Sequence, residues 1–95
     1  MQQPGLITVN VFRRHYGRRY TGLPVDMLDQ TSLVIQCDHR LMRPDLYDLC
    51  PGDLVRWRQD EQYVEAVISA VHREQRTISA TLSGFHQLPP DFFPY

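Results

Sequence analysis

Alternation of apolar and polar residues is the feature that most constrains the fold of this chain. Successive side chains of a β-strand point to opposite faces, so a half-buried strand repeats every two residues. The repeat is most regular near the C-terminus, where Ile78, Ala80 and Leu82 alternate with Ser and Thr. The stretches with this repeat are residues 6–13, 23–28, 31–37, 53–58, 62–72 and 76–83. We therefore predict an all-β fold without a long helix.

The apolar side of the alternating stretches predicts a single shared core. Its expected members are Val55, Trp57, Val64, Ala66, Ile68, Ile78, Ala80 and Leu82. The same alternation places Ala70 inward after Ile68, and it places Met27 on the same face as Val25.

The polar connections between the stretches are of hairpin length, which favours an antiparallel arrangement. A chain of 95 residues holds one domain. We expect a small SH3-like antiparallel barrel of five or six strands over residues 1–87. Residues 38–50 interrupt the alternation and predict a loop with one short helical turn that covers a barrel end.

The C-terminal sequence beyond Gly84 is rich in proline, which argues against a central strand there. We expect an extended tail, with residues 88–95 packed on the barrel. Phe92, Phe93 and Tyr95 are its large apolar side chains, and burial against the barrel or against a partner would remove them from water.

Charge is distributed unevenly although the formal net charge is only -1. Residues 1–25 hold four Arg and no acid, whereas residues 26–95 hold six Arg and eleven acids. The apolar runs are too short to span a membrane, and two cysteines do not make a disulfide framework. A cytoplasmic protein without membrane insertion is expected.

Residues 51–82 resemble the small SH3-like barrels of the KOW and Tudor type. The resemblance rests on Pro51-Gly52-Asp53-Leu54-Val55 opening a strand, on Trp57 soon after, and on Tyr63-Val64-Glu65-Ala66-Val67-Ile68 leading into a further hairpin. Members of this group bind RNA, modified peptides or proteins, so the resemblance implies a binding module.

Residues 13–20 concentrate four guanidinium groups and two phenols in an expected loop that bends at Gly17. Arginine neutralises phosphate and tyrosine offers a stacking face, a combination used on single-stranded nucleic acid. The alternative is that these arginines pair with carboxylates of the same chain. The candidate binding residues are Arg13, Arg14, Tyr16, Arg18, Arg19, Tyr20 and Arg56, together with Phe92, Phe93 and Tyr95 of the tail.

The segment Arg14-His15-Tyr16-Gly17-Arg18 is similar to the Arg-x-x-x-Arg element of PilZ domains, which bind a cyclic dinucleotide. The strand motif that follows in that family departs here, since Thr31 replaces Ser and Val34 replaces Gly. An expected strand also precedes the arginine pair here, whereas PilZ domains usually start with that pair. A cyclic dinucleotide is therefore kept as an alternative ligand.

Catalytic and metal-binding motifs give a third hypothesis, a metal-dependent or thiol enzyme around Cys37 and His39. A single Cys-x-His pair lacks the spacing of structural zinc sites, and an inward thiol is a poor nucleophile. No phosphate loop or nucleophile elbow occurs. We predict neither enzymatic activity nor a cofactor.

These observations favour a non-enzymatic interaction module, a small subunit or adaptor that contacts a protein partner in a larger assembly. The alternative is a nucleotide-binding or nucleic-acid-binding barrel that holds phosphates through residues 13–20.

Overall fold

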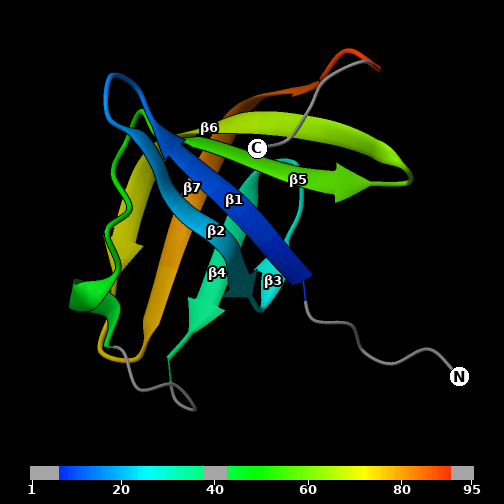
Figure 1. The fold of residues 1–95 in the computed structure, drawn as a ribbon. Coiled ribbons are helices and arrows are strands. Elements are labelled where there is room, and N and C mark those ends of the chain that lie inside the picture. The colour runs from blue at the N-terminus through cyan, green and yellow to red at the C-terminus, as the bar shows by residue number, and fades with distance from the viewer. Residues whose placement is uncertain (1–6, 38–42, 91–95) are drawn as a thin grey trace, which may run out of the picture.

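A single antiparallel sheet of seven strands curls into a half-barrel in the computed structural model, which describes residues 7–37 and 43–90 (Figure 1). The strands run in the order β2-β1-β5-β6-β7-β4-β3 across the sheet. Their bounds are β1 Ile7–Arg13, β2 Gly17–Val25, β3 Met27–Leu28, β4 Ser32–Gln36, β5 Leu54–Gln59, β6 Gln62–Arg73 and β7 Thr77–Gln87. The predicted all-β class is confirmed.

The two edges of the sheet are joined by the chain itself. β2 and β3 lie at opposite ends of the strand order, yet only Asp26 separates them in the sequence. Asp26 donates its backbone N–H to the Val34 carbonyl at 2.8 Å, and its carboxylate accepts the Gln36 N–H at 2.6 Å. One segment therefore leaves the first edge and enters the last, which holds the sheet in its curled shape.

The inner face of the curled sheet carries the core. All eight core residues predicted from the alternation are buried. The buried apolar residues are Val9, Val11, Leu23, Val25, Leu33, Ile35, Cys37, Tyr47, Leu49, Val55, Trp57, Val64, Ala66, Ile68, Ile78, Ala80 and Leu82. Period-two alternation thus predicts the core wherever the strands are regular.

Two inward predictions were wrong, and both fail where a strand is irregular. Ala70 is exposed because the β6–β7 register shifts between Ile68 and Ala70, which reverses the alternation and turns Val71 toward the core. Met27 is 60% exposed because the chain passes from β2 to β3 at Asp26, so it does not share the buried face of Val25.

Two element boundaries also differ from expectation. The predicted 13–20 loop is a tight hairpin, so β2 begins at Gly17. The predicted stretch 23–28 is divided at Asp26 between β2 and β3, which gives seven strands rather than five or six. β7 continues to Gln87, and the Leu88 N–H donates to the Tyr63 carbonyl at 2.8 Å. Residues 85–87 therefore form strand where a tail was predicted, since the prolines begin only at Pro89.

The described residues before β5, from Arg43 to Asp53, pack against the core of the sheet. They contain the 3-10 helix η1, Pro44–Leu46, which confirms the predicted short helical turn. Tyr47 and Leu49 follow it and are buried in the core. Within the described part of the chain, no helix has the length and apolar character needed to cross a membrane.

Replacing Ile68 with Ala should lower the free energy of unfolding by about 2 to 5 kcal/mol, because a fully buried side chain would leave a cavity. Urea unfolding followed by circular dichroism measures this change. Ala70→Ser is the matched control on the same strand, with an expected change below about 0.5 kcal/mol. Equal effects of the two changes would contradict the inward and outward assignment of β6.

Candidate functional site

The hairpin of β1 and β2 holds the arginines that the sequence singled out. β1 ends at Arg13 and β2 begins at Gly17, so Arg18, Arg19 and Tyr20 lie on a strand rather than in a loop. The Tyr16 N–H donates to the Arg13 carbonyl at 3.0 Å, and His15 has a φ of 70°. A tight turn therefore presents Arg14 and Tyr16 to solvent and fixes the strand residues on either side.

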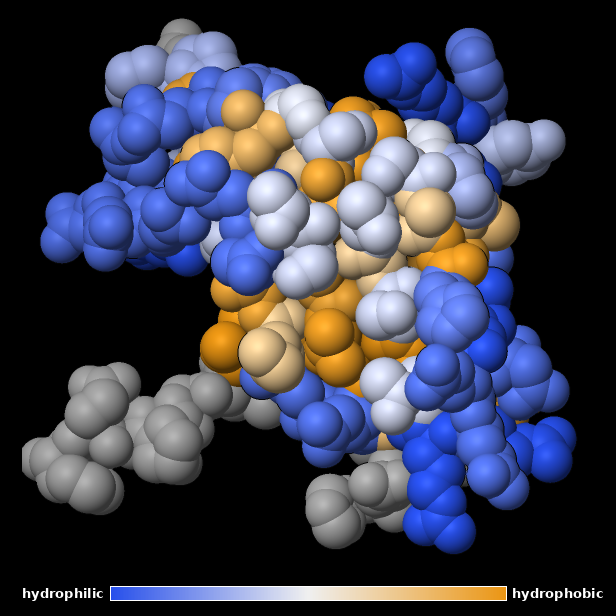
Figure 2. Space-filling model, turned by 180° about the vertical axis from the view of Figure 1, so that it is seen from behind, coloured by the Kyte–Doolittle hydropathy of each residue, from blue (hydrophilic) through white to orange (hydrophobic). Residues whose placement is uncertain are grey.

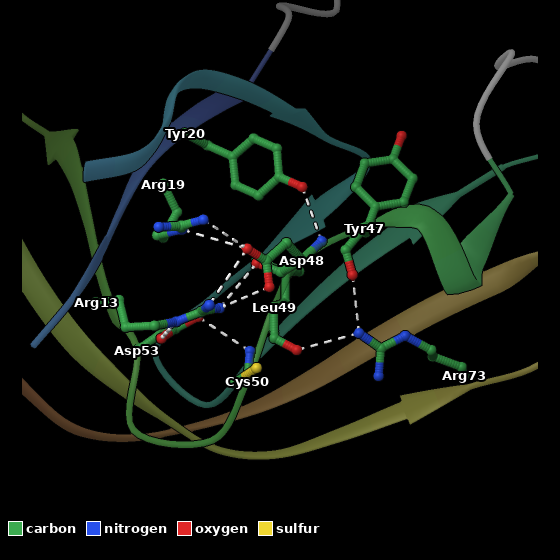
Figure 3. A network of polar contacts seen from close by, with 9 residues as sticks. All are labelled: Arg13, Arg19, Tyr20, Tyr47, Asp48, Leu49, Cys50, Asp53 and Arg73. Carbon is green, nitrogen blue, oxygen red and sulfur yellow. Dashed lines mark hydrogen bonds and ion pairs between the residues drawn. The ribbon is translucent and has the colours of Figure 1, made fainter. Parts of the chain in front are cut away.

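Arg13 lies between two carboxylates from the segment that precedes β5 (Figure 3). Its Nε and Nη2 donate to the two oxygens of Asp53 at 2.9 and 3.0 Å. Its Nη2 and Nη1 donate to Asp48 at 2.9 and 3.2 Å. Asp53 is only 1% exposed, so Arg13 neutralises a buried charge.

The same contacts shift proton equilibria toward the charged forms. Hydrogen bonds to Asp53 and Asp48 raise the pKa of Arg13 above its usual range. The hydrogen bond from Arg13 is the main cause that lowers the pKa of Asp48, and Arg19 lowers it further. Arg13 and Asp48 are therefore charged at neutral pH, and their attraction stabilises the fold.

Further contacts anchor the segment that follows η1. Arg19 pairs with Asp48 at 3.1 Å, and Tyr20 Oη accepts the Asp48 N–H at 2.8 Å. Arg73 of β6 donates to the backbone carbonyls of Pro44, Tyr47 and Leu49 at 3.1, 2.9 and 3.1 Å. Tyr20 and Arg73 reach the segment from different sides in Figure 3. This network is structural, since it fastens one loop to the hairpin and to β6.

The four hairpin arginines therefore separate into two pairs. Arg13 and Arg19 are engaged by carboxylates of this chain, as the alternative interpretation of the cluster predicted. Arg14 and Arg18 are exposed, and no described carboxylate forms an ion pair with either. Arg18 donates to Thr21 Oγ1 at 3.2 Å. Of the four hairpin arginines predicted to contact phosphate, only Arg14 and Arg18 are therefore without a carboxylate partner among the described residues.

Arg18 belongs to a second cluster, on the outer face of the sheet. Its guanidinium carbon lies 5.0 Å from the centre of the Phe12 ring, and that of Arg56 lies 4.4 Å from the same ring. Arg56 also pairs with Glu65 across β5 and β6 at 2.6 Å. His86 of β7 approaches Glu65 at 3.3 Å. Arg56 is the one predicted binding arginine outside the hairpin. It therefore points to the outer face, but Glu65 partly neutralises its charge.

A hollow of about 440 Å³ adjoins this cluster where β1 and β5 separate. We call it the β1–β5 hollow; its lining residues are Ile7, Thr8, Asn10, Arg56, Trp57, Arg58 and Tyr63. The Arg58 guanidinium carbon lies 5.9 Å from the centre of the Tyr63 ring. These two residues also line a second hollow of about 310 Å³, together with Glu61, Gln62 and residues 88–90.

Arg58 and Tyr63 were absent from the predicted site, although part of the signal was in the sequence. The alternation of β5 places Arg58 on the same outward side as Arg56, and the short Asp60-Glu61 turn places Tyr63 opposite Arg58. The neighbouring position of Asn10 depends on the pairing of β1 with β5, which no local pattern indicates.

The outer surface of β4 and β7 differs in chemistry from the face with the hollow. Its outward residues are Ser32, Val34, Gln36, Thr77, Ser79, Thr81 and Ser83, which carry no charge. Figure 2, seen from behind Figure 1, shows pale and apolar areas on that side between charged regions. Charged groups capable of selecting a ligand are therefore better represented around the β1–β5 hollow.

The remaining candidates have simple positions. Tyr16 is 74% exposed at the hairpin turn. Phe92, Phe93 and Tyr95 lie outside the described residues, as does His39. Cys37 is buried and Cys50 is exposed, and neither forms a disulfide bond. Among residues 7–37 and 43–90, no group of three His, Cys, Asp or Glu side chains could hold a metal ion.

Arg13→Ala should destabilise the protein by about 2 to 3 kcal/mol, because it removes charged hydrogen bonds from a buried carboxylate. Arg14→Ala is the neighbouring control, with an expected change below about 0.5 kcal/mol. Chemical unfolding at pH 7 compares the two variants. Similar stability of both would mean that Asp53 does not require Arg13.

Asp48→Asn should weaken the loss of stability in acid. The pKa of Asp48 is lowered in the folded state, so its contribution is present above the unfolded pKa of about 4 and is lost as the pH falls through the folded value. Urea unfolding between pH 7 and pH 2 should give a shallower decline for the variant than for the wild type. Asp60→Asn, at the exposed β5–β6 turn, is the control, and a variant decline as steep as the wild type would exclude this role of Asp48.

Residues of the hollow can bind through guanidinium, phenol and amide groups, and its apolar side is formed by Ile7 and Trp57. Arg58 offers a charge on one side, and strand backbone borders the other.

Comparisons with family models, curated proteins and solved structures found no match.

Proposed function

We propose that this chain is a non-enzymatic interaction module that binds a protein partner at the β1–β5 hollow. One observation carries the proposal: β1 and β5 separate around a hollow in which Arg58 and Tyr63 are presented beside exposed Ile7. The resemblance to SH3-like barrels supports a binding role. A cytoplasmic subunit or adaptor of a larger assembly fits this arrangement.

Charge favours a protein partner over a nucleic acid. Arg13 and Arg19 are paired with Asp48 and Asp53, and Arg56 is paired with Glu65. The turn beside Arg58 adds two further acids, Asp60 and Glu61. Nucleic-acid surfaces are typically continuous and basic, because affinity comes from many phosphate contacts. Scattered arginines beside acids suit individual contacts with carboxylates of a protein.

The second candidate is a nucleotide or nucleic acid, including the cyclic dinucleotide implied by the PilZ-like element. Its support is that Arg14 and Arg18, the two arginines of that element, are exposed without a carboxylate partner in the described residues. Binding of this kind should weaken steeply as salt rises, since each neutralised phosphate releases counterions.

Arg58→Ala should weaken retention of a partner while leaving stability unchanged, because Arg58 is exposed and forms no described ion pair. Wild type, Arg58→Ala and Arg43→Ala serve as baits for nuclease-treated lysate of the native host. Arg43 is the matched control, since its side chain is 76% exposed and lies away from the hollow.

The expected result is a protein retained equally by wild type and by Arg43→Ala, and retained several-fold less by Arg58→Ala. Retention that Arg58→Ala does not change would remove the hollow from the site. Retention from a parallel untreated lysate that is absent after nuclease treatment, or a wild type that holds a nucleotide, would establish the second candidate instead.

A further inference from the structure

The strand edges that border the β1–β5 hollow lack neighbours. Every residue of β1 except Asn10 pairs with β2, but only Asn10, Val11 and Phe12 pair with β5. All of β5 pairs with β6, and its residues 57–59 have no strand on their other side in the described part of the chain. The hollow thus opens between two strand edges that are each paired along only part of their length. The two strands diverge in Figure 1.

Every second residue of these edges has backbone groups available for pairing. In an antiparallel strand, alternate residues direct both N–H and C=O toward the same edge. No described loop supplies a backbone hydrogen bond to residues 7–9 or 57–59. Unpaired strand backbone is a template for another strand.

We propose, on the basis of the function proposed above, that the edge of β5 at residues 57–59 binds an extended acidic peptide segment as an added strand. Arg56 and Arg58 lie two residues apart on the outward side of β5. Side chains two residues apart on an added strand lie on one face at about the same spacing, roughly 7 Å. A carboxylate of the added strand opposite Arg58 would therefore reach its guanidinium group, whereas Asn10 of β1 already occupies the edge position beside Arg56.

The two arginines contribute unequally. Arg56 is already paired with Glu65, whereas Arg58 contacts only the Tyr63 ring among its described interactions. Arg58 is thus the main charge available to the peptide. The intervening peptide side chains point to the opposite face, where Ile7 and Trp57 favour apolar groups. The ligand class is a short strand that alternates acidic and apolar residues.

The probe is an acetylated and amidated hexapeptide of alternating Val and Glu. Its comparators carry Lys in place of Glu, or N-methyl groups on alternate residues that block one edge or the other of the peptide strand. Binding is measured by fluorescence anisotropy, and backbone protection is measured by amide hydrogen exchange.

We expect the Val/Glu peptide to bind wild type and Arg43→Ala, and to bind Arg58→Ala roughly fivefold more weakly or worse, as for the loss of one partly exposed ion pair. The Lys peptide should not bind. One of the two N-methylated peptides should lose binding, and exchange at residues 57–59 should slow in the complex.

Equal binding of both N-methylated peptides, or unchanged exchange at residues 57–59, would overturn strand addition while leaving the hollow as a site. Absence of binding by the Val/Glu peptide would also overturn it, and partner capture that still depends on Arg58 would then preserve the proposed function. Loss of the dependence on Arg58 in both experiments would reject both proposals.

Discussion

The ion pair between Arg13 and buried Asp53 is the interaction on which the arrangement of the two halves of the chain depends. Asp53 also accepts the Cys50 N–H at 2.9 Å, so its carboxylate shapes the turn before β5 as well as binding the hairpin. A carboxylate buried at this position is stable only when it is paired and hydrogen-bonded. The start of β5 and the end of β1 are therefore fixed together, next to the three residue pairs that join these strands.

This pair also decides which arginines remain for binding. Arg13 terminates β1 and Arg19 lies on β2, where both reach the segment that contains Asp48. Arg18 comes directly before Arg19 on β2, and it is directed to the outer face with Phe12 and Arg56. Neighbouring arginines of identical chemistry thus have different roles, because strand geometry turns them toward different surroundings.

Prediction from the sequence succeeded where one strand carries its own signal. The core residues of β5, β6 and β7 follow from alternation alone, as Val64, Ile68 and Ile78 illustrate. It failed at Ala70, since a one-residue bulge leaves no local signature and reverses every following side chain. The passage through Asp26 from one sheet edge to the other was equally invisible, because Val25 and Met27 keep a perfect alternation across it.

The candidate site was harder to predict for a related reason. Asp48 lay in the predicted 38–50 loop and Asp53 in the motif predicted to open a strand, and their attachment to Arg13 spans 35 and 40 positions of sequence. Arg58 was recognisable as outward, but the importance of that position depends on where β1 leaves β5. Contacts at such separations are set by the order of the strands, which composition and spacing do not contain.

The opening between β1 and β5 follows from the way the sheet curls. The pairing of β1 with β2 shifts register between Val9 and Val11, next to Asn10, where pairing with β5 ends. Bulges of this kind increase the local twist of a strand. The added twist at Asn10 accounts for the separation of residues 7–9 of β1 from β5, where the two strands no longer pair. An exposed edge invites pairing with other copies of the same chain, and charged side chains on the edge oppose it. Arg58 is such a charge, so the residue that discourages self-association at β5 is the one that would favour an acidic strand there.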